Sequence, residues 1–367
     1  MYLMDLFRVL SAFRLNPREE ACFRQGGEKV NFRRLVVWIP AVLMAVLLLG
    51  IGVQEALAAK KVRVGLFPFG ASRMVDEWIK DNGILKKWGK KYNLEMKISH
   101  PRDDFAAFMG KSVEIVALST MEIARLVGDE GHDILMYGRQ VDAFTSMYVR
   151  TNTSYKTPVD VKGKKIVHPG WDTGSAQMGS ILFKEWYGVD LKKDFRVVTA
   201  PWPVGPTLLA KGDVELAINL VPLTMKLEMG GKIRPLFSGY ATEWAKRRGT
   251  GHHLSITNFT SWGKWVRANE TAARAFLGAY TEGQKYAHAH SMEWAKKYKK
   301  YIAKNATDAQ INWYVNWFKK NGVVYPNAYI DQKFIDEETA FLKLALKAGL
   351  IKPAGINDRM WKILKPL

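Results

Sequence analysis

The feature that most constrains this chain is an alternation of short β-type runs with helix-length amphipathic runs, which begins after residue 60. Apolar residues in short runs or at alternate positions favour strands, whereas apolar residues spaced three and four apart favour helices. The alternation predicts strands at residues 62–66, 94–99, 114–118 and 134–137, with helices at 73–80, 103–109 and 121–127. A chain of this kind is expected to form an α/β fold whose sheets are mainly parallel.

The same succession of units recurs farther along the chain. It predicts strands at residues 165–167, 195–198 and 216–219, and helices at 175–186 and 205–211. Residues 109–126 and 210–227 also share an order of features: a helix end with Gly, then Val-Glu and an aliphatic residue, a short apolar strand and a new helix. Two lobes built from similar units follow from this repeat. The alternative, that two α-to-β junctions merely look alike, stays open.

The expected organisation is therefore two similar lobes joined by a hinge, with a helical C-terminal tail. The polar residues 151–158, TNTSYKTP, are the expected crossover between lobes, and a return crossover is expected within residues 238–260. We expect residues 59–150 and 250–367 to form lobe 1 and residues 151–249 to form lobe 2. Aromatic residues at helical spacing in the tail are expected to pack against a lobe: Trp313, Tyr314, Trp317 and Phe318.

An uncharged apolar segment precedes the first predicted strand. Residues 35–53 carry no charge, Arg33 and Arg34 stand directly before them, and Ala56, Leu57 and Ala58 follow, with small side chains at Ala56 and Ala58. This order is typical of a secretory signal peptide, so we expect export and cleavage near Ala58. Because the run is long for a signal peptide, an uncleaved membrane anchor is the alternative. Residues 1–58 thus form an N-terminal extension plus signal peptide, or an anchor.

Composition excludes several classes of protein. With 48% hydrophobic and 25% charged residues the chain is expected to be globular rather than disordered. Its 55 Lys and Arg against 35 Asp and Glu give a net charge of +20, which attracts anions. The lysines are scattered as pairs, without a zinc-finger, RNA-recognition or basic-arm pattern, so no nucleic-acid partner is expected. The single cysteine, Cys22, precedes the apolar segment, so neither a disulfide nor a thiol nucleophile is expected after cleavage.

A start of translation at Val30 is a further hypothesis, because it would leave a short basic segment before the apolar run.

Loops that follow predicted strands hold the candidate ligand contacts. Ligands of open parallel sheets bind beyond the carboxyl ends of strands, where helix N-termini present N–H groups that suit anions. Small residues keep the backbone accessible, hydroxyls donate hydrogen bonds and aromatic rings form apolar walls. A plain turn or helix cap is the alternative at each loop. The candidates are Phe69, Gly70, Ser72, Ser119, Thr120, Gly170, Trp171, Thr173, Gly174, Ser175 and Asn219.

Four further residues are weaker candidates for ligand contact. Trp202 and Val221 stand beside predicted helix starts. Arg73 and Arg139 carry guanidinium groups that match a carboxylate or sulfonate, although an ion pair within the protein is their alternative.

Sequence patterns of catalysis and metal binding are missing. The chain contains no G-x-S-x-G elbow, P-loop, dinucleotide fingerprint or H-E-x-x-H. The pairs His252 with His253 and His288 with His290 do not present two ligands from one helix face. We therefore expect no catalytic residue, no metal site and no cofactor.

Three of these segments together resemble the type 2 periplasmic solute-binding proteins, in particular the nitrate, sulfonate and taurine branch of ABC transport. The carriers are VRVGLFPFG at residues 62–70, VDVKGKKIVHPGWDTGS at residues 159–175, and LLAKGDVELAINLVPLTMKL, which ends at Leu227. The resemblance covers residues 61–260. It implies that the loops at residues 69–72, 119–121 and 171–175 line a cleft between the lobes.

The same resemblance implies a function. It implies a non-catalytic receptor, exported to the periplasm, which captures a small and anionic organic solute and delivers it to the membrane permease of an ABC importer. The aromatics Trp171 and Trp202 and the high positive charge depart from the pattern, so neither nitrate nor taurine is assigned. Two alternatives stay open. An enzyme on the same fold, of the pyrimidine-precursor type, would need a reactive residue in the cleft, and a membrane-tethered solute sensor would need an uncleaved apolar segment.

Overall fold

The computed structural model describes residues 59–67, 70–142, 144–171, 173–237, 239–322 and 324–367. The chain divides into two units, Met1–Ala58 and Ala59–Leu367, and the described residues all belong to the second. The predicted signal peptide or anchor therefore lies outside the described residues. Within the described part of the chain, no helix has the length and apolar character needed to cross a membrane.

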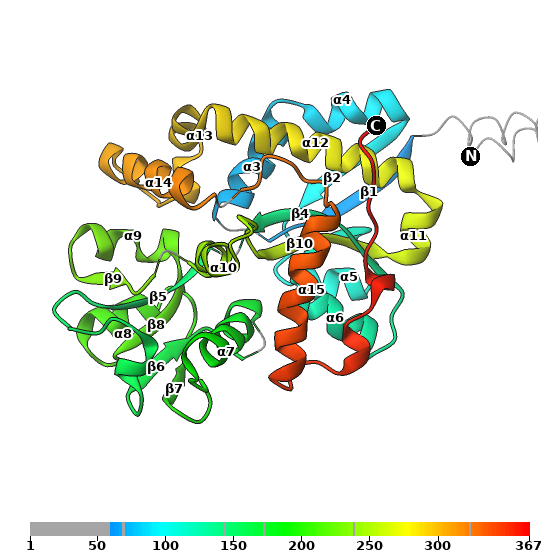
Figure 1. Ribbon diagram of the computed structural model, residues 1–367. Helices are drawn as coiled ribbons and strands as arrows, with labels where there is room; N and C mark the ends of the chain where they lie inside the picture. Colours follow the sequence, from blue (N-terminus) through cyan, green and yellow to red (C-terminus); the bar gives the residue numbers. More distant parts are fainter. Residues whose placement is uncertain (1–58, 68–69, 143, 172, 238, 323) are drawn as a thin grey trace, which may run out of the picture. The chain divides into compact units, whose positions relative to one another are not determined.

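Two five-stranded sheets organise the described residues (Figure 1). The strand orders are β2-β1-β3-β10-β4 and β7-β6-β8-β5-β9. Strand β10 runs antiparallel to both of its neighbours, as does β5, while the pairs β1–β2, β1–β3, β6–β7 and β6–β8 are parallel. The prediction of mainly parallel α/β sheets is confirmed, with one antiparallel strand in each. The strands are β1 Lys60–Gly65, β2 Leu94–Ser99, β3 Ile115–Leu118, β4 Ile134–Asp142, β5 Thr145–Arg150, β6 Lys165–His168, β7 Arg196–Thr199, β8 Leu216–Leu220, β9 Ile233–Pro235 and β10 Ser255–Trp262.

The two sheets share one topology. Replacing β1, β2, β3, β4 and β10 by β6, β7, β8, β9 and β5 converts the first strand order into the second. The repeated segments of the sequence contribute β3 and β8, which occupy the same place in the two orders. In each sheet the antiparallel strand, β10 or β5, is the first strand after the chain crosses from the other sheet. We call each sheet with the helices packed on it a lobe, the first lobe around β1 and the second around β6.

The chain crosses between the sheets earlier than predicted. Strand β5 pairs with β8 and β9 of the second sheet. The expected boundary after Arg150 is therefore wrong, and the crossing lies between Asp142 and Thr145. Residues 151–158, the predicted crossover, stay with the second sheet, because Arg234 Nη2 donates a hydrogen bond to the carbonyl oxygen of Thr153 at 3.1 Å.

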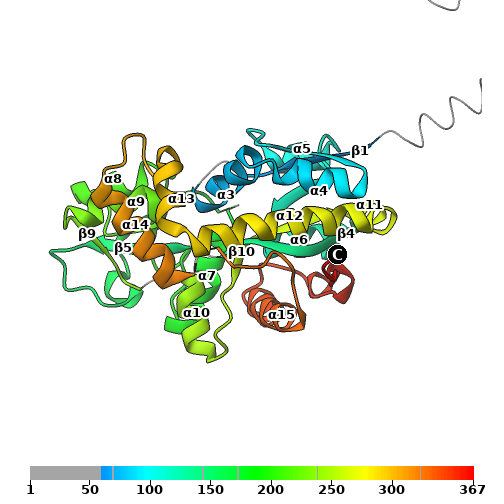
Figure 2. The same cartoon turned by 90° about the horizontal axis from the view of Figure 1, so that it is seen from above.

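Helices cover the sheets and fill the C-terminal part of the chain, as predicted (Figures 1 and 2). Several begin at a side chain that caps the first turn, such as Ser119 at α6, Thr173 at α7, Thr307 at α14 and Asp331 at α15. The α-helices are α3 Gly70–Asp81, α4 Ile84–Tyr92, α5 Asp104–Met109, α6 Thr120–Gly128, α7 Gly174–Tyr187, α8 Gly205–Lys211, α9 Val221–Met229, α10 Tyr240–Arg248, α11 Gly263–Ala268, α12 Glu270–Ala289, α13 Ser291–Lys297, α14 Asp308–Asn321 and α15 Gln332–Lys347. Short 3-10 turns are Pro158–Val161, Lys299–Tyr301, Pro353–Gly355 and Asp358–Met360.

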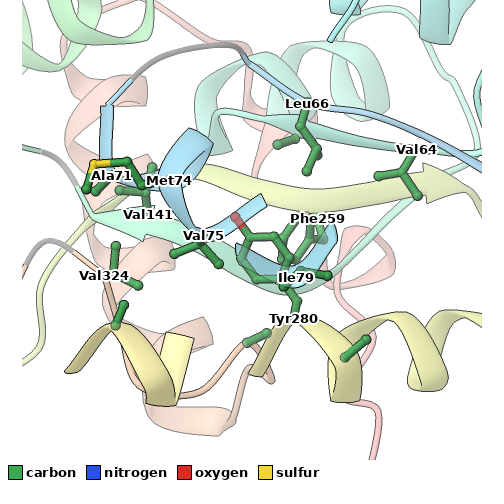
Figure 3. Packing of buried hydrophobic residues seen from close by; sticks show 14 of the residues in the cluster. Val64, Leu66, Ala71, Met74, Val75, Ile79, Val141, Phe259, Tyr280 and Val324 are labelled. Carbon is green, nitrogen blue, oxygen red and sulfur yellow. The ribbon is translucent and has the colours of Figure 1, made fainter. Parts of the chain in front are cut away.

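One face of the first sheet is buried under α3 and α12 (Figure 3). Val75 and Ile79 of α3 stand four residues apart and Met74 adjoins Val75, so the three apolar side chains share one helix face. They pack in the same cluster as Phe259 of β10 and Tyr280 of α12, and all five are 0% exposed. This packing holds the start of α3 at the carboxyl end of β1.

A second apolar cluster includes residues from both lobes. It contains Leu118 of β3, Ile166 of β6 and Phe341 of α15. Helix α15 contacts α6 of the first lobe and α7 of the second, and α14 contacts α9 of the second lobe. Within residues 250–367, which were predicted to belong to lobe 1, helices α14 and α15 thus also contact the second lobe.

Candidate functional site

Helix N-termini from the two lobes meet in two places. Gly174, the first residue of α7, lies against Ser119, the N-cap of α6: a Cβ atom on Gly174 would be 3.1 Å from Ser119 Cβ. Gly70, the first residue of α3, lies near the first turn of α9, where its Cβ would be 3.9 Å from Pro222 Cγ. Predicted loops of both lobes are thus brought together.

The two contacts are equivalent under the shared topology. Helix α3 follows β1 and meets α9, which follows β8; helix α7 follows β6 and meets α6, which follows β3. Because β6 matches β1 and β8 matches β3, exchanging the lobes converts one contact into the other. Since β1 neighbours β3, and β6 neighbours β8, the four helix starts gather in one region. We call this region, the first turns of α3, α6, α7 and α9, the interlobe seam.

At the start of α6 both predicted hydroxyls are engaged within the protein. Ser119 Oγ accepts a hydrogen bond from the Glu122 backbone N–H at 3.2 Å, and Glu122 Oε2 accepts one from the Ser119 N–H at 2.8 Å. Thr120 Oγ1 donates to Glu338 Oε2 at 2.6 Å and accepts from Asn258 Nδ2 at 3.1 Å. Apart from the Glu122 N–H, the first-turn N–H groups of α6 have no partner inside the helix.

The loop before α7 is held by Thr173 and Gly170. Thr173 Oγ1 donates to the Gly170 carbonyl oxygen at 2.8 Å and accepts from the Ala176 N–H at 3.3 Å, so it caps the helix. Gly170 has φ +143°, a backbone conformation that residues with side chains rarely adopt. Half-buried Trp171 places its ring 4.2 Å from that of His168, and Lys192 Nζ lies 5.0 Å from the Trp171 ring. The loop thus presents an aromatic wall beside the helix start.

His168 was not among the predicted contacts, although it directly precedes this loop. It ends β6 and is 1% exposed. Its Nδ1 accepts a hydrogen bond from the Gly170 N–H at 2.9 Å, so the ring proton sits on Nε2, which has no partner among the described residues. Burial lowers the pKa of His168 to about 4, which keeps the ring neutral near pH 7. The sequence signal was present in HPGWDTGS, where a histidine leads into a glycine-rich turn.

Ser175 and Asn219 hold neighbouring segments of the second lobe together. Ser175 Oγ lies 2.7 Å from Thr145 Oγ1, which joins the start of α7 to the first residue of β5. Asn219 Nδ2 donates to the Trp202 carbonyl oxygen at 2.8 Å, and its Oδ1 accepts from the Leu220 N–H at 2.8 Å. Each of these contacts positions a loop rather than leaving a side chain free.

The two arginine candidates are paired within the protein. Arg73 Nη2 lies 2.7 Å from Glu77 Oε1 on the same helix, and Arg139 forms a buried ion pair with Asp142. Both arginines therefore form the internal ion pairs that were predicted as the alternative to ligand contact.

The remaining candidates lie at helix starts or outside the described residues. Ser72 is buried in the first turn of α3, and Val221 is the buried first residue of α9. Phe69 lies outside the described residues. Among those described, no three His, Cys, Asp or Glu side chains gather as a metal site would require.

Comparison with known families gives one match. The family described as NMT1/THI5 like matches residues 85–293, more than half of the chain. The comparison with curated proteins found no match.

Solved structures share the fold at low sequence identity. The periplasmic aliphatic sulphonate-binding protein SsuA from Escherichia coli is 13% identical, with a TM-score of 0.65 over 84% of this chain and 94% of that chain. The alkanesulfonate-binding protein SsuA from Xanthomonas axonopodis pv. citri, bound to MOPS, is 15% identical, with a TM-score of 0.63 over 82% and 98%. The periplasmic nitrate-binding protein NrtA from Synechocystis PCC 6803 is 13% identical, with a TM-score of 0.58 over 83% and 86%. The chain has the fold of the periplasmic binding proteins and belongs to the NMT1/THI5-like family.

Proposed function

We propose that the chain is an extracytoplasmic solute-binding receptor, not an enzyme, that delivers a small sulfonate- or carboxylate-like anion to the permease of an ABC importer. The observation that carries the proposal is the interlobe seam, where the first turns of α3, α6, α7 and α9 meet in two equivalent contacts. The sulfonate-binding proteins that share the fold support this ligand class.

The chemistry of the seam favours an anion. The N-terminus of an α-helix carries roughly half a positive charge together with N–H groups that lack helical partners. Four such ends from two lobes surround one region, and the whole chain carries a net charge of +20. His168 adds an unpartnered N–H, and Trp171 adds an apolar wall for the organic part of the solute.

Closure of the lobes is the proposed mechanism. A ligand that contacts helix starts of both lobes favours the arrangement in which those starts are close. The chain passes between the sheets at residues 142–145 and again before β10, so the backbone changes of a hinge are expected there. No bond is made or broken in the solute.

A thermal-shift panel tests the ligand class. The panel contains ethanesulfonate, taurine, acetate, nitrate, bicarbonate and a pyrimidine, each at the same ionic strength. A ligand that binds only the folded state raises Tm, by an amount that grows with the logarithm of its concentration relative to Kd. We expect at least one sulfonate or carboxylate to raise Tm by several degrees. A panel in which only neutral compounds shift Tm would contradict the proposed anion site.

A wedge at the seam tests the location. In Gly174→Val the new Cβ would meet Ser119 Cβ at 3.1 Å, and the two branches would force α6 and α7 apart. We expect the anion-induced rise in Tm to be lost, while the unliganded variant still unfolds cooperatively at a somewhat lower Tm. Gln332→Val is the matched control, because Gln332 is the exposed first residue of α15. An undiminished anion response in Gly174→Val would place the ligand elsewhere.

Recovery of the solute separates a receptor from an enzyme. After prolonged incubation of the protein with the anion found above, mass spectrometry should return only the unchanged anion. A product that forms with the wild type and not with Gly174→Val would establish an enzyme at the same seam.

A further inference from the structure

A cavity lies between α14 and the second lobe, away from the first turn of α9 that belongs to the interlobe seam. Its volume is about 300 Å³. Glu228, which lines it, stands seven residues after Val221 on α9, so it lies about 10 Å along the helix from the end that meets the seam. One wall comes from β5, α9 and β9, and the other from α14, which contacts α9 (Figures 1 and 2). The lining residues are Tyr148, Glu228, Pro235, Trp313, Asn316, Trp317, Lys320 and Asn321.

Aromatic rings form much of this lining. Trp313 and Trp317 are four residues apart on α14 and therefore lie on one face of that helix, where both are half-buried. Tyr148 of β5, 1% exposed, contributes from the opposite wall. The faces of indole and phenol rings carry partial negative charge and attract cations.

A carboxyl group without a cationic partner completes the lining. Glu228 Oε1 accepts a hydrogen bond from Thr224 Oγ1 at 2.7 Å. Among the described residues Glu228 forms no ion pair within 4.0 Å. Burial raises its pKa to about 7, against the opposing effect of hydrogen bonds from Thr224 and Tyr148. A cation bound in the cavity would supply the opposite charge that the carboxylate lacks.

Lys320 is the basic residue of the lining. It is exposed, and it stands three residues after Trp317, near the solvent side of α14. Its ammonium group repels a cation and is not paired with Glu228. Glu228, Trp313 and Trp317 are half-buried and Tyr148 is buried, whereas the lysine is the exposed part of the lining.

We propose that this cavity is a second ligand site, selective for a small organic cation whose ammonium group contacts Trp313 and Trp317 and pairs with Glu228. The site is independent of the proposed function at the seam. Because α14 is connected through α13 to the first lobe, where Trp294 Nε1 donates to the Met74 carbonyl oxygen at 3.2 Å, the cation would lie between elements of both lobes.

Titration of tryptophan fluorescence with choline chloride, in the full chain, tests the proposal. Its neutral isostere 3,3-dimethyl-1-butanol and sodium chloride serve as controls for shape and ionic strength. We expect a saturable change with choline below about 10 mM, since one carboxylate with aromatic contacts supports roughly millimolar binding. We expect no saturable change with either control compound. Equal responses to choline and to its neutral isostere would overturn the claim of charge selectivity.

Variants then locate the response. Glu228→Gln keeps the shape and removes the charge, and we expect at least a tenfold weaker affinity, about 1.4 kcal/mol. Trp317→Leu should weaken binding by roughly tenfold as well. Lys320→Ala should leave affinity unchanged or improve it severalfold, and Lys319→Ala, the exposed neighbour outside the lining, is its matched control.

The outcomes separate this site from the seam. Thermal melts of each variant without ligand show whether it folds, and a variant that fails to fold is replaced by Trp313→Leu. A choline affinity that is unchanged in Glu228→Gln would overturn the cavity as the site. Loss of anion response in Gly174→Val with choline binding intact is the result expected if both proposals hold.

Discussion

Glu338 shows how much a single buried side chain organises in this protein. It is 0% exposed on α15 and accepts hydrogen bonds from Thr120 Oγ1 at 2.6 Å and from the Ser255 N–H at 2.8 Å. Thr120 opens α6, and Ser255 opens β10, the strand that returns from the second lobe. Burial raises the pKa of Glu338 to about 7, an effect opposed by the hydrogen bonds from Ser255 and Thr120. One carboxyl group thus joins the seam, the returning strand and the C-terminal helix.

The raised pKa of Glu338 predicts a pH dependence of stability. The pKa of Glu338 is higher in the folded chain than the ordinary value of 4.5. The protonated carboxyl therefore stabilises the fold fully below pH 4.5, and this contribution is lost as the pH rises through about 7. Glu338→Gln mimics the protonated form. We expect the difference in the free energy of unfolding in urea, Glu338→Gln minus wild type, to increase between pH 5 and pH 8 by up to roughly 3 kcal/mol.

Two buried histidines change the stability with pH in the opposite direction, and their effect cancels when Glu338→Gln is compared with the wild type. Burial lowers the pKa of His168 and of His252 to about 4, so their contribution to stability is lost as the pH falls from 6.5 towards 4. Both are present in the wild type and in the variant, so they cancel in the difference. The exposed Glu95→Gln is a control for the loss of one charge. A difference between Glu338→Gln and wild type that does not vary with pH would refute the assignment.

At the scale of elements, α15 acts as a brace between the lobes. Glu337 and Glu338 point their carboxyl groups to different partners: Glu337 Oε2 accepts from Trp244 Nε1 of α10 at 2.9 Å, while Glu338 binds the first lobe. Phe341, one turn later, is 0% exposed and meets the Trp244 ring edge to face at 6.1 Å. The helix contacts α6 and α7 together. Its apolar face therefore contributes to both lobes at once.

Phe341→Ala tests the brace. Removing a fully buried aromatic side chain costs about 3 to 5 kcal/mol through lost burial and the cavity left behind. We expect that loss in the free energy of unfolding, measured in urea by far-UV circular dichroism. Lys343→Ala, exposed on the same helix, should change stability by less than about 0.5 kcal/mol. Equal effects of the two substitutions would show that α15 is not a packed part of the core.

The whole molecule combines two equivalent halves with an N-terminal segment that is predicted to direct export. The shared strand order makes the two contacts of the seam equivalent, so both lobes present the same kind of helix start to a common region. Residues 35–53, with Arg33 and Arg34 before them, predict that this molecule acts outside the cytoplasm.

Export predicts a defined mature N-terminus. Small side chains at Ala56 and Ala58 suit a signal peptidase, so we expect the processed chain to begin at Ala59 or Lys60. Mass spectrometry of the N-terminal peptide, after expression in a Gram-negative host and release of the periplasm, checks this. Ala58→Tyr should block processing and leave a longer, membrane-associated chain. A wild-type chain that keeps residues 35–53 would instead indicate an anchor.

Much of the candidate site was predictable because its signals are local. The loops after β1, β3 and β6 were expected to hold Gly70, Ser119 and Gly174, and the structure brings these residues to the seam. His168 was missed although it leads into a glycine-rich turn, because its burial and its hydrogen bond from the Gly170 N–H are set by the fold. The sequence did not show which of Ser119 and Thr120 caps α6. Only the structure shows that Ser119 is the cap and that Thr120 binds Glu338, which lies 218 residues away in the chain.

The amino-acid sequence alone determined the alternation of strands and helices, the repeat behind two matching lobes, and the hydroxyl-bearing loops that lead into α6 and α7. These depend on side-chain periodicity and on hydrogen bonds within a few residues. Only the tertiary structure decided that β5 belongs to the second sheet, that β10 lies between β3 and β4, and that α14 closes a cavity over Glu228. Those arrangements depend on which apolar faces and strand edges meet between segments that lie far apart in the chain, and no local pattern encodes that choice.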